Sequence, residues 1–440
     1  MSRILISATP IPGHANPLLL VGEHLSKRGH TVVFHCGDLF REKAEAAGLQ
    51  FVPLLGGANY DYRRLGELFP ERNAVEPGLQ QLSYDMQHGF GDQIPDQYRG
   101  LQGIIDQYGI DAVVTDCLFM GSYPLLLGAS KSSPPVIGCS SFPLWMRRRA
   151  VSPFTGLDST AEGLRRNAEH NRQFEDALAP ATEYINALLK VCGASRSIGF
   201  VIDASCTVFD AFLQFTAEEF EYAVDDKPAN LHFVGPMIPA VTSSEEPEWL
   251  KKIDGSRPVV LVTQGTIANS DFNQVVKPAI AALAEENIQL IVTTGGGDLD
   301  IPLSPNVHVE SYIPYPLVLP KVDVFVTNGG YNGVQQALSL GVPVIAAGAT
   351  EDKPFVAARV AAFGVGIDLK TGSPTAEQIR DAVRTVLSDG KYKQRALEMQ
   401  KAFARCNALE TTAAIVESTI AESAMPVWSE QEMRAAVGKR

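Results

Sequence analysis

The chain has 440 residues, enough for two or three domains, and 45% of them are hydrophobic, so a large buried core is available. Its formal net charge of −13 argues against nucleic acids and anionic membranes as partners, because both bind basic surfaces. No apolar run approaches the roughly 20 residues of a membrane-spanning helix, and prolines soon interrupt the apolar start of the chain. We therefore expect a cytoplasmic protein without a signal peptide or a membrane span. The six cysteines show no Cys-x-x-Cys spacing, which favours buried, reduced thiols.

The first half alternates strand and helix patterns. Residues 3–8 have strand character, a loop at 9–16 follows, and Pro17 suits the first position of a helix that Gly29 ends. Together with a strand at 31–35, this makes a βαβ unit. The alternation continues with helices and strands at 39–47, 51–54, 101–108, 112–115 and 135–137. Residues 56–100 and 140–200 lack a clear period, and loops of that length are often functional lids or walls.

The second half repeats the pattern after a break. Residues 237–257 are rich in proline, serine and acidic residues, which is typical of an interdomain linker. Helices then alternate with strands expected at 258–263, 289–293, 306–310, 322–327 and 344–347, and a helical region runs over 375–424. The sequence therefore predicts an α/β protein with two Rossmann-like domains, 1–236 and 258–424, that face each other across a cleft. Residues 425–440 form a tail.

Residues 322–347 hold the strongest local signal for a binding site. A β-branched strand pattern breaks at Asn328-Gly329-Gly330, and a helix pattern follows until Gly341. The first turn of a helix has free N–H groups and about half a positive charge, so a glycine turn there can cradle a phosphate. A tight βα turn without a ligand explains the pattern about equally well. A polar cluster at 350–353 follows the next strand, however, and would open on the same sheet edge, where α/β proteins bind ligands.

This stretch resembles the donor-binding signature of the nucleotide-sugar-dependent glycosyltransferases of the GT-B fold, the superfamily of UDP-glucosyl and UDP-glucuronosyl transferases. The residues that match the signature are Gly330, Tyr331, Asn332, Gly333, Gly341 and Pro343. Three positions depart from it: Asn328 replaces a phosphate-binding His, Gln336 a ribose-binding Glu, and Lys353 a sugar-binding Gln. Asn and Gln still donate and accept hydrogen bonds, so the departures concern which nucleotide and sugar are bound rather than the fold. Without a membrane span, the chain is similar to the soluble microbial members.

His14 is the candidate catalytic base. A neutral imidazole with a pKa near about 6.5 can accept a hydroxyl proton, although a lone His in a loop is more often only a polar loop residue. Gly13-His14 followed by Pro17 matches the opening motif of the resembled family, which implies the catalytic role. Asp116 follows the strand 112–115, and the resemblance implies that it orients the His14 ring and stabilises the imidazolium. A helix N-cap is the alternative role for Asp116.

The resemblance also implies a donor site for a nucleotide diphosphate sugar in the second domain. The expected contacts come from Gly13, Thr266, Tyr312, Ile313, Asn328, Gly330, Asn332, Gly333, Gln336, Asp352 and Lys353. Thr266 can offer a hydroxyl and an N–H to a phosphate, although a simple turn also explains its segment. Tyr312 would either stack on the uracil beside Ile313 or pack in the core. Lys353 would either contact the sugar beside Asp352 or pair with an acidic neighbour.

The acceptor pocket is expected in the irregular parts of the first half. Its candidate lining residues are large and apolar, with core packing as the alternative: Phe90, Phe119, Phe142, Trp145 and Met146. Asp298-Leu299-Asp300 has the spacing of a metal motif, but such tripeptides arise by chance in an acidic chain. GT-B enzymes need no metal, so the resemblance implies no metal site and no cofactor besides the UDP-sugar co-substrate.

The predicted function is an inverting, metal-independent glycosyltransferase. It would move a hexose, glucose from UDP-glucose, to a hydroxyl of an apolar small molecule such as a phenolic, a flavonoid or a polyketide. The alternative is a sugar-nucleotide-binding accessory or sensor protein without transfer activity, which the departures at the donor signature suggest. A pure binder needs no base, so the presence of both His14 and Asp116 favours the enzyme. A nucleotide-sugar epimerase is a third hypothesis and would require acid–base carboxylates near the sugar.

Overall fold

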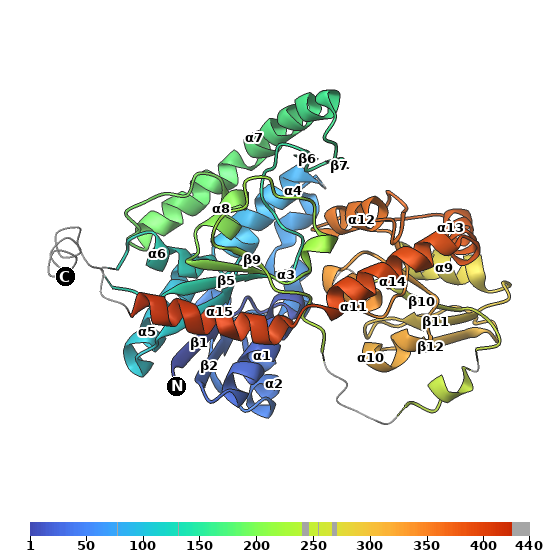
Figure 1. Ribbon diagram of the computed structural model, residues 1–440, viewed down its shortest axis with the longest axis horizontal. Coiled ribbons are helices and arrows are strands. Elements are labelled where there is room, and N and C mark those ends of the chain that lie inside the picture. The colour runs from blue at the N-terminus through green and yellow to red at the C-terminus, as the bar shows by residue number, and fades with distance from the viewer. Residues whose placement is uncertain (77, 131, 240–245, 254, 266–270, 425–440) are drawn as a thin grey trace, which may run out of the picture.

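Two parallel sheets form the centres of two α/β lobes that lie side by side along the long axis of the molecule (Figure 1). The computed structural model describes residues 1–424 apart from 77, 131, 240–245, 254 and 266–270. A small antiparallel hairpin, β6 (Val151–Ser152) and β7 (Gly156–Leu157), lies apart from both sheets. The predicted α/β class with two Rossmann-like parts is confirmed.

The first sheet has seven parallel strands. Their spatial order is β3 (Gln50–Pro53), β2 (Thr31–Cys36), β1 (Arg3–Ser7), β4 (Ala112–Asp116), β5 (Val136–Ser140), β8 (Ala211–Gln214) and β9 (Leu231–Phe233). The helices of this half are α1 (Pro12–Lys27), α2 (Arg41–Ala46), α3 (Leu65–Leu68), α4 (Leu79–Tyr84), α5 (Ile94–Tyr108), α6 (Tyr123–Leu126), α7 (Ala161–Val191) and α8 (Val201–Thr207).

The second sheet has six parallel strands. Their spatial order is β12 (Val307–Glu310), β11 (Gln289–Thr293), β10 (Val259–Thr263), β13 (Val324–Thr327), β14 (Val344–Ala346) and β15 (Gly366–Asp368). The helices of this half are α9 (Val276–Leu283), α10 (Tyr315–Val318), α11 (Tyr331–Ser339), α12 (Lys353–Ala362), α13 (Ala376–Ser388), α14 (Gly390–Ala404) and α15 (Ala408–Ser423).

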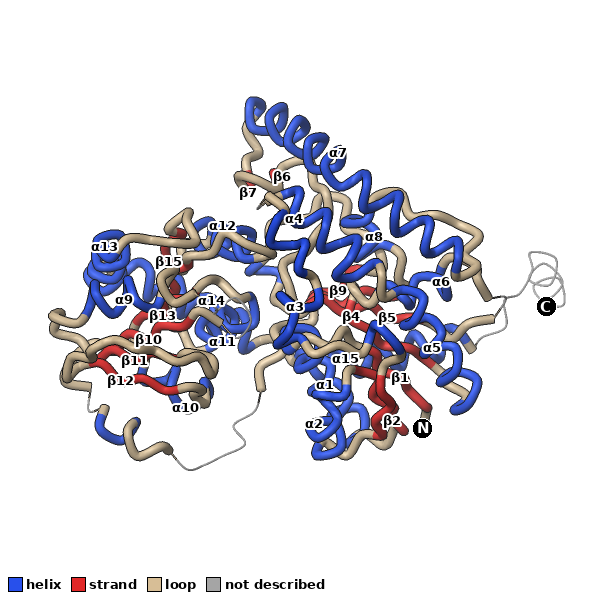
Figure 2. Tube along the Cα trace, turned by 180° about the vertical axis from the view of Figure 1, so that it is seen from behind, coloured by secondary structure: helices blue, strands red, loops and turns tan. Residues whose placement is uncertain are grey.

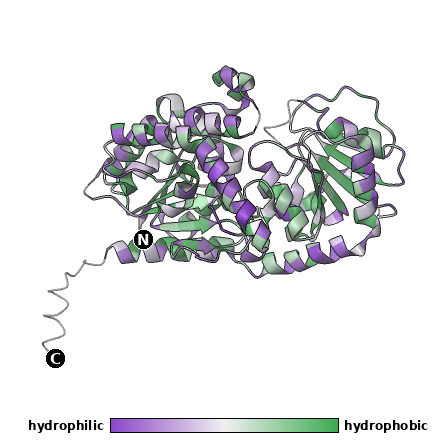
Figure 3. Cartoon of the chain, turned by 90° about the horizontal axis from the view of Figure 1, so that it is seen from above, coloured by the Kyte–Doolittle hydropathy of each residue, from purple (hydrophilic) through white to green (hydrophobic). Residues whose placement is uncertain are grey.

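The central strands are apolar and buried over their whole length. β10 reads VVLVT and β13 reads VFVT, and every residue of both is buried. Strands covered by helices on both faces favour such continuous β-branched runs over alternating patterns. Figure 3 shows the consequence, with hydrophobic strands inside and hydrophilic helix faces outside.

Each sheet reverses its strand order at one point, and the loops beside this point are the expected place for a ligand. In the first sheet β1 lies between β2 and β4, so the chain runs outward in both directions from the β1–β4 pair. In the second sheet the corresponding pair is β10 and β13. Ligands of open α/β sheets bind outside the carboxyl ends of strands at such switch points. The loops after these four strands are therefore the natural site.

Several local expectations were wrong. α1 begins at Pro12, so Pro17 lies inside the helix rather than at its start. The stretch 140–200 is not a loop, because α7 occupies 31 residues of it. Its buried positions Phe174, Leu178 and Ile185 recur at helical spacing, but the many charges between them obscured the pattern. Strands β8, β9 and β15 were not expected, since three or four residues are too few to show a period.

The last helix crosses back to the first lobe. The expected helical region 375–424 consists of α13, α14 and α15, and α15 lies along α1 in both Figure 1 and Figure 2. Val416 is fully buried in the same apolar cluster as Leu25 of α1. The Arg28 guanidinium pairs with Glu417 of α15 at 2.9 Å. The expected second domain, 258–424, therefore includes a helix that packs on the first domain, because its apolar face fits the first core.

Candidate active site

His14 and Asp116 meet at the carboxyl edge of the first sheet. His14 lies in the first turn of α1, which follows β1, and Asp116 ends the neighbouring strand β4. The ring Nδ1 of His14 lies 3.0 Å from Oδ1 of Asp116. When Nδ1 carries a proton and donates it to this carboxylate, Nε2 keeps its lone pair and can accept a proton. The pair therefore has the geometry of an oriented base.

The Asp116 carboxylate is itself held in place. Its residue is only 3% exposed. Oδ2 accepts from the backbone N–H of Thr9 at 2.6 Å, and Oδ1 accepts from the N–H of Leu118 at 3.1 Å. Two backbone donors leave the carboxylate little freedom to turn away from the ring. Asp116 does not act as a helix N-cap, because the next helical turn, Met120–Ser122, has Phe119 at that position.

The electrostatic environment of His14 favours its protonated form. Burial lowers the pKa of His14, whereas the charge and the hydrogen bond of Asp116 raise it. Asp352 and Glu351 of the second lobe raise it further, so the pKa lies above the usual value of 6.5. The imidazolium that would result from proton transfer is therefore stabilised by carboxylates of both lobes.

A free helix carbonyl joins the two lobes beside His14. Pro17 has no N–H, so the carbonyl of Gly13, four residues earlier in α1, lacks its usual intrahelical donor. This carbonyl accepts instead from Oγ of Ser141 at 2.7 Å and from Nδ2 of Asn332 at 3.2 Å. Asn332 belongs to the first turn of α11. The contact brings the N-terminus of α11 next to the candidate base.

The turn before α11 has the shape expected of an anion site. Gly329 has a φ of 92°, a conformation that a side chain disfavours. Gly330 is the N-cap residue and is half-buried, as is Gly333 in the first turn. The first turn of a helix leaves N–H groups without intrahelical partners, and the Asn332 side chain of this turn contacts the carbonyl of Gly13. A phosphate could approach the backbone closely here.

The two departures from the donor signature near this turn make contacts within the protein. Asn328 is buried, and its Nδ2 donates to the carbonyl of Gln264 at 2.5 Å, which ties the turn after β13 to the turn after β10. Gln336 is half-buried, and its Nε2 donates to the carbonyl of Asn332 one turn earlier at 3.4 Å. Thr266, the third candidate for the diphosphate region, lies outside the described residues.

The polar loop before α12 lies close enough to His14 for Asp352 and Glu351 to raise the pKa of His14. Asp352 is the N-cap residue of α12, and burial raises its pKa although Lys353 opposes the shift. Lys353 is buried and its ammonium pairs with the carboxylate of Glu351, so the structure shows the pairing expected as one of its two roles. Glu351 adopts a left-handed φ of 56°. Such strain in a residue other than glycine is concentrated at binding sites.

Tyr312 is a surface residue. It is 68% exposed, and its hydroxyl donates to the carbonyl of Gly295 at 2.8 Å. The alternative of core packing for Tyr312 is therefore wrong. Ile313 is half-buried and packs against the core of the second lobe. An exposed ring at the end of β12 is free to stack on a flat ligand.

Aromatic side chains flank His14 on the side of the first lobe. The ring centroids of Phe90 and Phe142 lie 6.2 and 6.1 Å from that of His14. Trp145 follows at 5.1 Å from Phe142 and contacts Phe355 of α12 at 5.9 Å. Trp145 and Phe355 line a cavity between the loop at 144–156, α7 and α12, and Met146 lines it too. Four of the five acceptor candidates thus lie beside His14 or this cavity.

Phe119 does not belong to this group. It is fully buried in the core of the first lobe, where its ring meets the edge of the His35 ring at 6.2 Å. The expectation that Phe119 lines the acceptor pocket is wrong, because the chain turns inward after Asp116. Core packing, the stated alternative, is what the structure shows.

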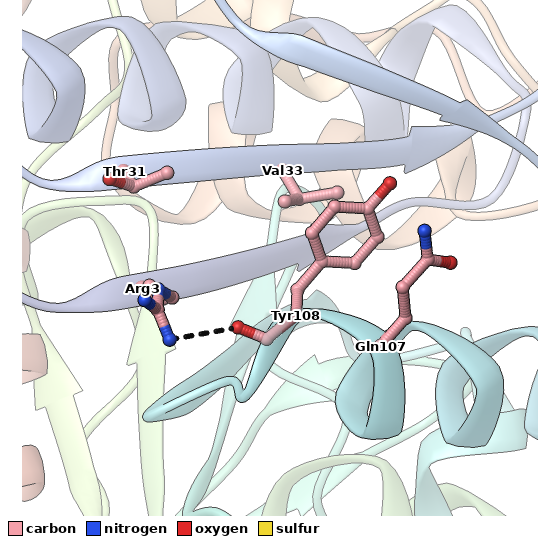
Figure 4. Close-up of a pocket in the computed structure, with 5 residues that line it drawn as sticks. All are labelled: Arg3, Thr31, Val33, Gln107 and Tyr108. Atoms are coloured by element: carbon pink, nitrogen blue, oxygen red, sulfur yellow. Dashed lines mark hydrogen bonds between the residues drawn. The ribbon is translucent and has the colours of Figure 1, made fainter.

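Another pocket lies at the opposite end of the first sheet. Figure 4 shows its lining, in which Arg3 and Thr31 begin β1 and β2 and the Arg3 guanidinium donates to the carbonyl of Tyr108 at 3.3 Å. His14 follows the carboxyl end of β1, so the length of the strand separates the two places. This pocket plays no part in the candidate active site.

Comparisons with known proteins identify the family of this chain. Residues 277–417 match the family described as "Erythromycin biosynthesis protein CIII-like, C-terminal domain". UDP-glycosyltransferase 2 of Phaeomoniella chlamydospora is 35% identical over 431 residues, which cover 93% of this chain and 94% of that protein. This chain belongs to the UDP-glycosyltransferase family. UDP-glucosyltransferase B1 of Starmerella bombicola is 32% identical over 437 residues, which cover 96% and 98% of the two chains.

A solved structure supports the fold of this glycosyltransferase. The glycosyltransferase of kitacinnamycin superposes with a TM-score of 0.73 over 95% of this chain and 98% of its own, at 20% identity. The fold is therefore GT-B, and the chain is a transferase that uses a nucleotide-sugar donor. Among the described residues, no helix is both long and apolar enough to cross a membrane.

Two residues that contact the candidate site were not anticipated. Ser141 directly follows β5, so the rule that sites gather at the carboxyl ends of strands could have found it. Phe355 lies two residues after Lys353, but only the packing of α12 against Trp145 shows that it faces the first lobe. The spacing of residues in the sequence carries no information about the contact between Phe355 and Trp145.

Proposed function

We propose that this glycosyltransferase moves glucose from UDP-glucose to a hydroxyl of an apolar small molecule, with inversion at the anomeric carbon and without a metal ion. The observation that carries the proposal is the contact of Asn332 with the carbonyl of Gly13. It joins the first turn of α11, a cradle for a diphosphate, to the residue that precedes the oriented base His14. The base that takes the proton of the acceptor hydroxyl and the diphosphate that leaves the donor would thus lie close together.

His14 Nε2 takes the proton of the acceptor hydroxyl in this proposal, while Nδ1 donates to Asp116. The acceptor oxygen attacks the anomeric carbon from the face opposite the diphosphate, the new carbon–oxygen bond forms, and the bond to the phosphate oxygen breaks. UDP leaves with the electron pair of that bond. The N-terminus of α11 offsets the negative charge that develops on the phosphate, so no cation is required. Closing of the lobes excludes water that would hydrolyse the donor.

The proposed donor contacts follow from the second lobe. Gly330, Asn332 and Gly333 would hold the diphosphate with Gly13 nearby, and Asn328 would shape the turn. Tyr312 would stack on the uracil beside the backbone of Ile313, and Gln336 would bind the ribose. Asp352 and Lys353 would bind the sugar hydroxyls. The relatives that are named UDP-glucosyltransferases support UDP-glucose as the donor.

The proposed acceptor is flat and apolar, such as a phenolic, a flavonoid or a polyketide. Phe90 and Phe142 flank the His14 ring, and Trp145 extends the aromatic wall toward α12. Aromatic walls bind planar rings by stacked and edge contacts. Because the rings of Phe90, Phe142 and Trp145 carry no charge, they favour an apolar acceptor over a strongly hydrated one.

The proposal is tested by incubating the protein with UDP-glucose and a panel of phenolic acceptors. Glycosides detected by mass spectrometry, β-configured by NMR and formed equally well in EDTA, are the expected result. His14→Ala should lower kcat/KM by about 10²- to 10⁴-fold, the usual contribution of a general base. His232→Ala, on the edge strand β9, is the matched control and should leave the rate unchanged. Glycoside formation by His14→Ala at the wild-type rate would remove His14 from this role.

A further inference from the structure

A segment of the first lobe enters the core of the second. After β8 the chain leaves the first sheet as the residues 215–222, which we call the interdomain strap. The carbonyl of Phe215 accepts from Nε2 of Gln335 in α11 at 3.1 Å. The Phe220 ring stacks on Tyr331 of α11 at 6.2 Å, with an interplanar angle of 16°. The strap therefore packs beneath the helix whose first turn forms the phosphate cradle.

The strap ends in a buried ion cluster that spans the two lobes. Glu221 is accompanied by Arg148 of the first lobe and Arg359 of α12, and their side chains are 0%, 7% and 3% exposed. Nε and Nη2 of Arg359 donate to the Glu221 carboxylate at 3.1 and 2.6 Å. Nη1 of Arg148 donates to the same carboxylate at 3.1 Å. One carboxylate thus accepts hydrogen bonds from two guanidinium groups, one from each lobe.

The cluster also touches the walls of the active site. Oε2 of Glu221 accepts from the N–H of Leu144 at 3.2 Å, and Arg148 donates to the carbonyl of Leu144 at 3.3 Å. Leu144 immediately precedes Trp145 of the aromatic wall. On the other side, Arg359 donates to the carbonyl of Phe355, which contacts Trp145. Glu221 is therefore bonded to the segment 142–148, which we call the acceptor wall, and to α12.

Stability alone does not account for such a cluster. Burying three charges costs several kcal/mol of desolvation per ion, and well-packed apolar side chains in their place are often as stable or more stable. An ion cluster adds geometric specificity. A carboxylate that accepts hydrogen bonds from two guanidinium groups and a backbone N–H permits only one arrangement of these partners.

We propose that Glu221 is a positioning residue for glycosyl transfer: it holds the acceptor wall at 142–148 in register with α12. The acceptor oxygen is then in line with the anomeric carbon of the sugar that α12 binds. This inference rests on the proposed function. It predicts that the loss of Glu221 impairs the alignment of acceptor and donor more than the binding of either.

The test is Glu221→Gln in the full chain. A misplacement of about 1 Å costs about 10²-fold in rate, so kcat for glycoside formation should fall by about that factor, while KM for UDP-glucose stays within about threefold. The share of UDP-glucose that is hydrolysed rather than transferred should rise, because water still reaches the donor. Glu219→Gln is the matched control: it makes the same change two residues earlier in the strap, at a half-exposed side chain that pairs with Arg405.

A second variant keeps the test decisive should Glu221→Gln fail to fold. Arg148→Lys keeps the charge and the Arg359–Glu221 pair but cannot bond Glu221, Tyr222 and Leu144 together. It should show the same fall in kcat and faster hydrogen exchange at 142–148. Wild-type kcat in either variant, or equal losses of donor binding and kcat, overturns the inference. Absence of transfer by the wild-type protein would instead overturn the proposed function, while the exchange measurement would still test the contact.

Discussion

At the scale of single residues, His14 owes its chemistry to the groups around it. A solvated imidazole titrates near about 6.5 and rotates freely. Here the carboxylate of Asp116 fixes one ring nitrogen at 3.0 Å, and the backbone N–H groups of Thr9 and Leu118 fix that carboxylate. The same arrangement raises the pKa of His14 despite its burial. Since a base acts in its deprotonated form, the rate should increase as the pH rises through this elevated pKa.

Asp116→Asn should change both the size and the pH dependence of the rate. The neutral amide no longer stabilises the imidazolium and can select the wrong tautomer, so kcat/KM should fall by about 10²- to 10⁴-fold. The inflection of the remaining activity should move to lower pH, because the main cause of the raised pKa of His14 is gone. A pH–rate profile of both proteins measures this. A variant that kept the wild-type inflection would show that Asp116 does not set the pKa of the base.

At the scale of elements, the first turns of three helices carry the site. α1 presents His14, α11 presents Gly330 to Gly333, and α12 begins directly after the polar loop at 350–352. Each follows a strand near a switch point, so their N-termini converge with their partial positive charges. Pro17 modifies α1 in a specific way, because it frees the carbonyl of Gly13 for Ser141 and Asn332.

Pro17→Ala should separate helix stability from function. Ala supplies the missing N–H, so the helix closes its own hydrogen bond and the contacts from Ser141 and Asn332 weaken. Thermal stability should stay equal or rise, while kcat/KM falls by about three- to tenfold, the value of one net hydrogen bond. Pro180→Ala is the control, since Pro180 also lies inside a helix, α7, but is exposed. Unchanged kinetics of Pro17→Ala would mean that the Gly13 carbonyl does not position His14.

At the scale of the whole molecule, the chain ties the lobes together with two exchanged segments. The strap at 215–222 carries Phe220 of the first half into the core of the second. In the opposite direction, α15 carries Val416 into the core of the first lobe. Each lobe thus includes apolar side chains from the other half of the chain. The lobes are therefore interdependent in stability as well as in function.

Val416→Asp should destabilise the first lobe, although Val416 is far along the sequence from the residues that form the sheet of that lobe. An unpaired charge buried in the apolar cluster that contains Leu25 should lower the free energy of unfolding by about 3 kcal/mol or more. Ala414→Asp places the same charge on the exposed face of α15 and should have little effect. Thermal unfolding followed by circular dichroism compares the two variants. Equal unfolding temperatures would show that α15 is not packed on the first lobe in solution.

The sequence by itself determined the local features. Apolar β-branched runs of strand length predicted buried strands such as β10 and β13, and the glycines at 329 and 341 marked the turns that bound α11. The order of strands and helices was enough to predict two Rossmann-like parts, and the motif residues were enough to recognise the family. These features depend on neighbours within a few positions, so the chain encodes them directly.

Tertiary structure alone decided which distant groups meet. Phe119 is buried in the core, and α7 forms in a stretch whose sequence suggested a loop. The helix α15 packs on the first lobe. The side chains of Arg148, Glu221 and Arg359 form one ion cluster. The sequence separation within that cluster is more than 200 residues from Arg148 to Arg359. Such contacts depend on which apolar faces cover each other, and propensity and spacing do not determine that choice. The physical reason is that burial and ion pairing are properties of the packed molecule, whereas turns and periods are properties of the chain.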